Sequence, residues 1–402
     1  MSKNGAKQIK ISKGTLGMVI AVCALAVLMA FLLILRTNQG VCEWICRNLV
    51  SGYQAVAGRF FSVTRANIFE ISAAIGAALA IAMIITSIVL FCKKKRVASR
   101  RVMLSLIVIC FCIANLYIFA AGFAYNREAA PLVKYQGDVS KEHALESYIS
   151  LIDDIKTCYD EIGNYNEDGS VICPYSEREL DDKVRKAVDD ILKDDYYYSY
   201  TPKAKAVISS RLMTYNSIAG ITFLPTCEPC YNKEMPIVER VHTLAHEYAH
   251  TKGVMREYEA NLVATYVLLN SGDAYLKYCA YVDAYSDIDD LIRYDETYFD
   301  NVKLYDTPEG FDRDCGIILF WWWHQPSFGD FGSIVNDLYL KLQGQSEGTG
   351  SYEETPGTDE IIIGGEDGEE DRYLEIITEY TNMHRMLIAF GDSLKSKIIK
   401  NN

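Results

Sequence analysis

The first third of the chain lacks acidic residues. Residues 1–125 contain fourteen Lys and Arg but only two acids, Glu43 and Glu70. Their net charge is +12, and since the 402-residue chain carries −13, residues 126–402 carry −25. A basic N-terminal part followed by an acidic remainder is typical of a membrane anchor joined to a soluble domain. The acidic part also lacks the clustered Lys and Arg that phosphate binding needs, which excludes nucleic acid as a partner.

Charges of either sign are missing from three long stretches, which cover residues 14–35, 71–92 and 102–126. Each exceeds the roughly 20 apolar residues that a helix needs to cross the hydrocarbon core of a bilayer. No small-residue cleavage pattern follows Leu35, which argues against a cleaved signal peptide. We therefore expect residues 1–126 to form a membrane anchor with three spans in the lipid bilayer. Spans without ionisable residues offer no polar pathway, which argues against a transporter or channel.

The basic residues near these spans predict an orientation. Four lysines precede the first span, and six basic residues lie between positions 93 and 101. Because positive charge near membrane ends stays in the cytoplasm, we expect a cytoplasmic N-terminus and an extracytoplasmic domain over residues 127–402. The first outer loop, residues 36–70, mixes aromatic residues with Arg47 and Arg59. It indicates either an amphipathic helix on the outer membrane interface or a helix packed on the soluble domain.

Only one Cys-x-x-Cys pair is present, Cys227 and Cys230, and no second pair completes a structural zinc site. Spacing of this kind also occurs in redox motifs, but a local disulfide or a plain structural role is favoured here. Eight of the twelve cysteines fall outside the spans, where disulfides are permitted.

The periodicity of apolar residues predicts a mostly helical soluble domain, with helices within residues 141–193, over 238–252, 256–269 and 274–284, and near 373–394. Residues 219–224 have β-type composition and end at Pro225, which predicts a short strand or hairpin before helix 238–252. Trp321–Trp323 predict a buried aromatic segment or a contact with the membrane surface. The Glu-, Asp- and Gly-rich segment 353–371 predicts a solvated loop.

The strongest chemical signal is the pattern His246-Glu247-Tyr248-Ala249-His250. Positions i and i+4 of a helix lie on one face, so the two imidazoles can bind one Zn²⁺ ion. Glu247 can then take a proton from a zinc-activated water and pass it to the leaving amine. We therefore expect a zinc metallopeptidase that hydrolyses amide bonds of proteins or peptides. His242 continues the i, i+4 series, but three such residues span too much of the helix axis for one metal.

A catalytic zinc site needs a third protein ligand, and residues 256–261 supply candidates. On an unbroken helix Glu257 would lie about 10 Å along the axis from His250, which is too far to share a metal. The chain must therefore turn back between them, and Gly253 stands where a helix end permits it. Glu257 then becomes the third ligand, with Glu259 as the alternative, and Asn261 can hydrogen-bond a ligand histidine.

Three further residues are weaker candidates. His324 and Tyr339 could stabilise the oxyanion of an amide undergoing attack, although a packed or surface role is favoured for each. Glu228 could contact substrate or order a loop at the site, and it could equally cap a turn.

The combination of HExxH with a following Glu257-Tyr258-Glu259-Ala260-Asn261 resembles the gluzincin type of metallopeptidase. In that pattern the first Glu, here Glu257, is the third zinc ligand, and an Asp stands where this chain has Asn261. Over most of its length the chain also resembles bacterial domain-of-unknown-function family 3810. The resemblance covers three N-terminal spans, residues 219–225, Glu228, Asn232, the segment 246–261 and residues 336–352. It implies a membrane-anchored, zincin-like fold and a metallopeptidase.

A different class of function stays open beside this one. The chain could be a non-catalytic envelope protein that uses a metallopeptidase fold for binding or scaffolding. The loop 36–70, the cysteine pair and the acidic segment would suit a protein partner. An intact Glu247 favours the enzyme, since a binding module has no use for a general base.

Overall fold

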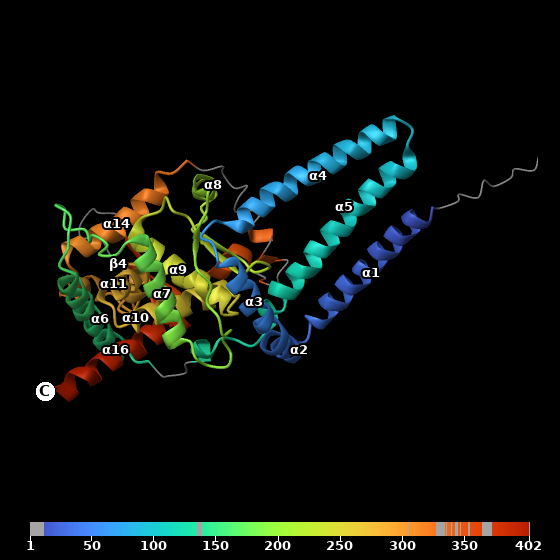
Figure 1. Cartoon of the computed structure of the whole chain (residues 1–402). Coiled ribbons are helices and arrows are strands. Elements are labelled where there is room, and N and C mark those ends of the chain that lie inside the picture. The colour runs from blue at the N-terminus through green and yellow to red at the C-terminus, as the bar shows by residue number, and fades with distance from the viewer. Residues whose placement is uncertain are drawn as a thin grey trace, which may run out of the picture. The chain divides into compact units, whose positions relative to one another are not determined.

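The structure, a computed structural model, describes residues 12–134, 139–304, 306–326, 334, 336–338, 340–341, 345, 347–352, 354–363 and 372–401. The chain is mainly helical, as predicted, with a few short strands (Figure 1). It divides into two compact units. One comprises Met1–Val50 and Ile68–Arg127, and the other comprises Ser51–Asn67 and Glu128–Asn402.

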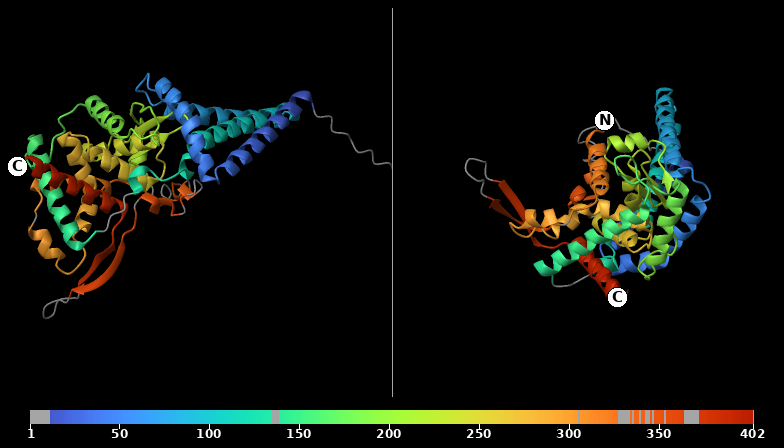
Figure 2. Two further views of the ribbon diagram at one scale, coloured as in Figure 1. Left: turned by 90° about the horizontal axis from the view of Figure 1, so that it is seen from below. Right: turned by 90° about the vertical axis from the view of Figure 1, so that its left-hand side faces the viewer.

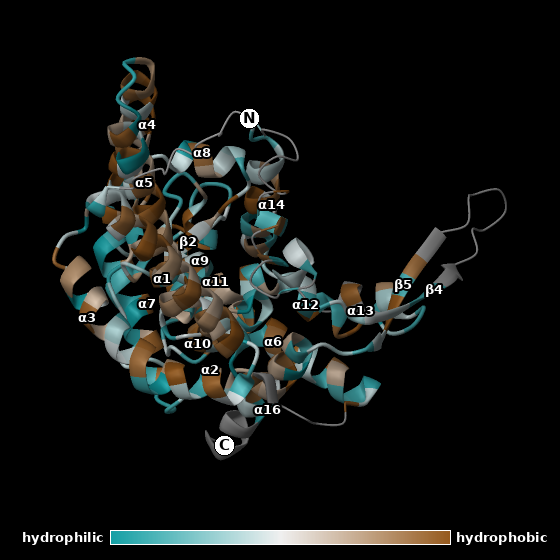
Figure 3. Cartoon of the chain, turned by 90° about the vertical axis from the view of Figure 1, so that its right-hand side faces the viewer, coloured by the Kyte–Doolittle hydropathy of each residue, from teal (hydrophilic) through white to brown (hydrophobic). Residues whose placement is uncertain are grey.

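The first unit contains three helices that are long and apolar enough to cross a membrane. They are α1 (Lys13–Leu35), α4 (Ile68–Cys92) and α5 (Arg96–Tyr117), and α5 continues through η2 (Ile118–Gly122) and η3 (Ala124–Asn126). Hydrophobic residues predominate along these helices, as the brown segments of the ribbon indicate (Figure 3). The prediction of three apolar N-terminal helices is therefore confirmed.

Helix α5 contacts both α1 and α4. A polar contact joins α5 to each of them. The Asn115 side chain donates to the carbonyl of Leu25 on α1 at 3.2 Å, and the hydroxyls of Ser87 and Ser99 join α4 to α5 at 2.9 Å. Between α1 and α4 the first unit also holds α2 (Gln39–Ile45) and the π-helical turn η1 (Cys46–Val50).

Helix α9 (Ile237–Thr251) lies at the centre of the second unit. It contacts α7 (Glu177–Ile191), α10 (Glu257–Leu269), α11 (Ala274–Asp283) and the strands described below (Figure 1). Nearly every residue of α9 is buried, including its polar ones. Within the described residues, this unit also contains the helices η4 (Pro131–Lys134), α6 (Lys141–Ile162), α8 (Ser210–Tyr215), α12 (Tyr285–Asp290), α13 (Tyr298–Leu304), α14 (Glu309–Trp323), η5 (Gly348–Tyr352) and α16 (Asn382–Asn401).

A small sheet precedes α9 and packs on it. Strands β2 (Gly220–Phe223) and β3 (Glu228–Tyr231) form the predicted hairpin, with Ile221 opposite Cys230. Strand β1 (Lys205–Ala206), which the sequence analysis missed, pairs in parallel with β3 and gives the order β1-β3-β2. Both β2 and β3 contact α9, so the sheet lies directly over the HExxH helix.

Helix α3 (Ser51–Phe61), from the first outer loop, belongs to the second unit. The Tyr53 hydroxyl donates to the Pro225 carbonyl at 2.5 Å, and the Gln54 amide donates to the Leu224 carbonyl at 3.1 Å. This packing corresponds to the second of the two interpretations of loop 36–70.

The C-terminal part differs from the prediction. The acidic segment 353–371 contains strand β4 (Gly357–Ile363), which pairs antiparallel with β5 (Arg372–Glu379), and the hairpin projects from the helices of its unit (Figure 2). The final helix, α16, therefore begins at Asn382 and not near Tyr373. The charged residues and glycines of this segment predict a loop, although Ile361, Ile362 and Ile363 favour a strand.

We predict that Lys205→Met destabilises the second unit. Lys205 and Glu228 form an ion pair at 2.5 Å, and each side chain is 1% exposed. The variant leaves a buried carboxylate without its cation, which costs about 3–5 kcal/mol of unfolding free energy. Urea unfolding of the full chain in detergent measures this.

The control is Lys186→Met, which breaks an exposed pair with Asp190 and should change stability little. The double variant Lys205→Met, Glu228→Gln removes both charges and should recover most of the loss. A single variant as stable as the wild type would contradict the prediction.

Candidate metal centre

The centre is built by a reversal of the chain between α9 and α10. Gly253 follows the end of α9 with a φ of 90°, a left-handed conformation that favours glycine. Val254 N donates back to the Ala249 carbonyl at 3.1 Å and closes the turn. Arg256 is the N-cap of α10, so Glu257 begins a helix that runs back along α9. The chain thus turns where the spacing argument requires.

Three side chains converge at this reversal. His246 and His250 lie one turn apart on α9, with their ring centroids 4.6 Å apart. Glu257 Oε2 lies 3.2 Å from His246 Nε2 and 3.5 Å from His250 Nε2. All three residues are nearly buried. Two imidazole nitrogens and one carboxylate oxygen therefore meet at one point.

Hydrogen bonds orient both imidazoles toward Glu257. His246 Nδ1 lies 2.7 Å from Asn261 Oδ1, and His250 Nδ1 lies 2.7 Å from the Val254 carbonyl oxygen. Since both partners are acceptors, each Nδ1 carries a proton, which leaves each Nε2 as the ring nitrogen that would bind a metal ion. Asn261 in turn donates to the Tyr352 carbonyl at 2.8 Å. The expected contact between Asn261 and a histidine of the motif is therefore present in the structure.

Glu247 lies beside this group and is held from β2. The Thr222 hydroxyl donates to Glu247 Oε2 at 2.6 Å. A Cβ atom on Gly220 would lie 2.3 Å from Glu247 Oε1, so the carboxylate occupies space that only glycine leaves open. Ligand-type atoms of Glu247, His246 and His250 all lie within 4.8 Å of one another.

The buried charges at the centre shift one another's pKa values. Burial opposes the charge of His250, but Glu257 and Glu247 outweigh it and raise the pKa of His250 to about 9. Burial likewise opposes the charge of Glu257, but His250 and His246 lower its pKa to about 2. Burial raises the pKa of Glu247, and the two histidines reduce that rise. Glu257 is thus an anion that attracts cations, and Glu247 accepts a proton more readily than an exposed carboxylate.

The donor set can be compared with what a metal ion requires. Zinc binds His nitrogen and carboxylate oxygen at about 2.0–2.2 Å in tetrahedral geometry, which places two ligand atoms roughly 3.3 Å apart. The separations of 3.2 and 3.5 Å fit that value. Hydrogen-bonded Nδ1 atoms are also what metal-binding histidines usually have. The residues present therefore fit a zinc ion.

Comparison with known proteins identifies the family of this chain. The family model described as "Protein of unknown function (DUF3810)" matches residues 46–357, well over half of the chain. The chain belongs to the DUF3810 family. The resemblance identified from the sequence is thereby confirmed. Neither a curated protein nor a solved structure matched the chain.

Two of the sequence-predicted residues of this DUF3810 protein lie in other networks. The Glu259 carboxylate, the alternative ligand, pairs with Arg256 at 2.6 Å and accepts from the Ala130 backbone N–H at 3.1 Å. Glu228 forms the buried ion pair with Lys205. That contact joins β1 to β3, so Glu228 stabilises the sheet.

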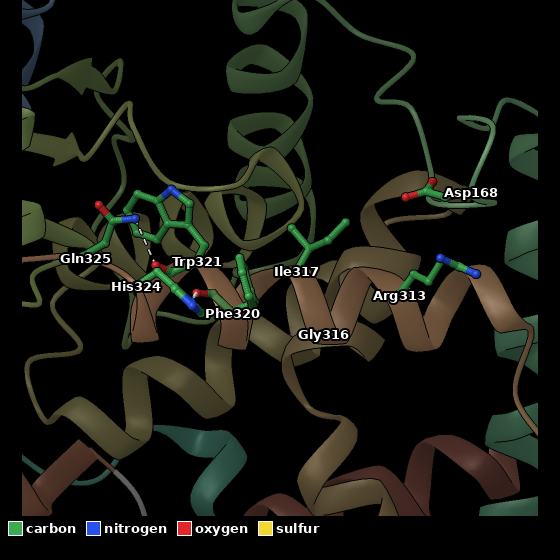
Figure 4. A pocket seen from close by; sticks show the side chains of 8 residues that line it. All are labelled: Asp168, Arg313, Gly316, Ile317, Phe320, Trp321, His324 and Gln325. Carbon is green, nitrogen blue, oxygen red and sulfur yellow. Dashed lines mark hydrogen bonds between the residues drawn. The ribbon is translucent and has the colours of Figure 1, made fainter.

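His324 ends α14 and lines a groove of about 380 Å³ (Figure 4). Its Nδ1 lies 2.8 Å from the Phe320 carbonyl oxygen, and its ring lies against the Phe320 ring at a tilt of 32°. Among the described residues, the cluster of possible metal ligands on α9 consists of His246, Glu247 and His250 and does not include His324. Trp323 is 86% exposed, so the first of the two interpretations of Trp321–Trp323, a buried aromatic segment, is wrong at this residue. Tyr339 lies outside the described residues.

The Cys227 and Cys230 thiols are buried, and neither is in a disulfide. Burial raises the pKa of each thiol further above its usual value. A thiol is reactive and binds metal as the thiolate. The raised pKa values therefore favour a structural role over redox chemistry.

Sequence reasoning missed four contributors to the centre. Gly220 and Thr222 alternate along β2, so both point to the same face of the strand, toward α9. That alternation was a usable signal once the hairpin had been predicted. The Val254 carbonyl and the Tyr352 carbonyl contribute backbone atoms, for which no side-chain pattern exists.

We predict that Glu239→Gln stabilises the protein more at pH 8.5 than at pH 5. Burial raises the pKa of Glu239 to about 8 from 4.5, although Trp322 donates to it at 2.6 Å. A carboxyl group with a raised pKa in the folded state loses stability as pH rises from about 4.5 to 8. Glutamine keeps the acceptor without the charge. Thermal unfolding midpoints of both proteins at both pH values measure this.

Glu309→Gln is the control, because the Glu309 side chain is 84% exposed. Its effect should be the same at both pH values. An equal effect of Glu239→Gln at pH 5 and pH 8.5 would contradict the prediction.

Proposed function

We propose that this DUF3810 protein is a membrane-anchored zinc metallopeptidase that hydrolyses amide bonds in proteins or peptides. The convergence of His246, His250 and Glu257, with Glu247 one residue from the first histidine, carries the proposal. The donor types and their separations suit zinc, and the order HExxH–Glu is that of gluzincins. In this proposal the second unit is a zincin-like domain.

The mechanism assigns a role to each side chain. His246, His250 and Glu257 hold the metal, and Asn261 and the Val254 carbonyl keep the two imidazoles in position. When bound, zinc lowers the pKa of a water molecule toward about 7 and polarises the amide carbonyl. Glu247 takes the proton from the attacking water and donates it to the amine nitrogen as the C–N bond breaks. The Thr222 hydroxyl holds one oxygen of Glu247 throughout.

The sheet beside the centre suits an extended polypeptide substrate. Strand β2 is at one end of the order β1-β3-β2, so among the described strands it has a neighbour on one side only. An edge strand offers backbone N–H and C=O groups to a second extended chain. Thr222 on β2 contacts Glu247. A peptide paired with β2 would therefore pass close to the general base.

We propose that the second unit lies on the outer side of the membrane. Three helices are apolar enough to span the bilayer. The basic residues at the N-terminus and between the second and third spans favour a cytoplasmic N-terminus. The second unit would then be extracytoplasmic, where its substrates would also lie.

We predict that the purified full chain binds about one zinc per molecule and loses it in His246→Ala and Glu257→Ala. Glu247→Gln should keep the zinc and lower kcat about 100- to 10,000-fold, because it removes only the proton acceptor. Asn261→Ala should weaken zinc binding about 10- to 100-fold, since His246 loses its hydrogen bond. Elemental analysis and peptide hydrolysis measure these effects.

The full chain is required because α3 packs on the second unit. His143→Ala is the matched control, since His143 pairs with Asp392 away from α9 and should keep its zinc. Folded wild-type protein without zinc would contradict the proposal. A Glu247→Gln variant that retains its biological role would favour the scaffold function.

We also predict that Gly220→Ala retains zinc and loses most of the hydrolytic activity. The added Cβ would overlap Glu247 Oε1, so the general base must move while the three ligands stay. We expect a fall in kcat of about 100-fold or more. Gly316→Ala, where a Cβ meets nothing within 4 Å, should behave as wild type. Full activity in Gly220→Ala would contradict the assigned position of Glu247.

A further inference from the structure

Helix α3 has two different faces. One face packs on the second unit, where Gln54, Ala57 and Gly58 are buried. The contacts to Leu224 and Pro225 place this face on the turn between β2 and β3. The helix is therefore a rigid part of the unit that carries the candidate metal centre.

The opposite face is apolar and exposed. Val56 is 70% exposed, Phe60 is 70% exposed, and Val63, two residues beyond the helix end, is 85% exposed. Val56 and Phe60 are about one turn apart and therefore lie on one side of the helix. Val63 follows in the turn after the helix, where its N–H donates to the Phe60 carbonyl at 3.4 Å. Single exposed apolar residues are ordinary on protein surfaces. A row of them on one side of an amphipathic helix is typical of a helix that lies on a membrane interface.

The chain itself indicates what this face meets. Asn67 is 1% exposed, and its amide donates to Cys230 Sγ on β3 at 3.3 Å. The next residue, Ile68, begins α4, one of the three helices able to span a membrane. Ile68 stands five positions after Val63, which is at most roughly 18 Å of extended chain. If α4 crosses a membrane, the connecting chain keeps this apolar face within that distance of the start of the span.

The charge of this segment also matches a lipid surface. Residues 51–67 contain Arg59 and Arg65 and no acidic residue. Arg65 pairs with Asp181 at 2.8 Å, so Arg59 is the basic side chain that would meet lipid headgroups. Arg59, next to Phe60, is exposed and lies over the Tyr200 ring at 4.7 Å. Basic side chains beside an apolar stripe favour anionic headgroups.

We infer that α3 docks the second unit on the outer leaflet, with Val56, Phe60 and Val63 inserted between lipid headgroups. The same helix holds the β2–β3 turn, and β2 holds Glu247 through Thr222. If the proposed peptidase activity holds, its substrates are polypeptide segments that emerge at the membrane surface. The docking itself does not depend on hydrolysis.

Photo-crosslinking of the full chain tests this docking. p-Benzoylphenylalanine is placed at Phe60 and, separately, at Val63, and each protein is reconstituted into vesicles of phosphatidylethanolamine and phosphatidylglycerol. After irradiation, mass spectrometry identifies the adducts. We expect lipid adducts at both positions, and the same adducts in a Glu247→Gln background, since docking needs no activity.

Two further positions serve as the positive and the negative control for lipid crosslinking. Ile75, exposed on α4, should give lipid adducts, and Lys186, on the charged surface of α7, should give none. Lipid adducts at Ile75 without any at Phe60 and Val63 would overturn the inference. Adducts of Phe60 with protein would overturn it too, because the face would then be covered by another chain. No adduct at Ile75 would overturn the membrane span on which the inference rests.

Discussion

The Glu257 carboxylate lies between two imidazoles that another helix supplies, and this contact determines how α9 and α10 meet. An anion and two histidines that are nearly buried are stable only if each polar atom has a partner. The turn at Gly253 satisfies this, because it brings the Val254 carbonyl to His250 and Asn261 to His246. The turn that closes α9 thus also orients the candidate ligands.

The local part of this arrangement could be predicted from the sequence. The spacing of His246 and His250 places them on one helical face, and the rise per residue required a reversal before Glu257. Asn261 follows one helical turn after Glu257, which predicted its contact with a histidine. The three apolar helices and a short strand or hairpin before α9 were also predicted, because uninterrupted apolar runs and β-type composition are local signals.

Contacts between distant segments could not be predicted. The two residues of β1 are too few to show a pattern, and only pairing with β3 makes them a strand. Glu228 gave no sign of its ion pair with Lys205, 23 residues away. Strand β4 was missed because its acidic and glycine-rich surroundings resemble a loop. It forms a strand by pairing with β5, and that pairing is not visible in the composition of β4 alone. In each case tertiary pairing outweighs local propensity.

The central claim is that two histidines of α9 and Glu257 bind zinc and that the cysteine pair does not. X-ray absorption spectroscopy at the zinc edge of the purified full chain tests it most directly. We expect nitrogen and oxygen neighbours at about 2.0–2.2 Å, with the multiple-scattering signal of two imidazoles and no sulfur. Sulfur neighbours at about 2.3 Å would place the metal at cysteines and contradict the account. A folded protein without bound zinc would contradict it equally.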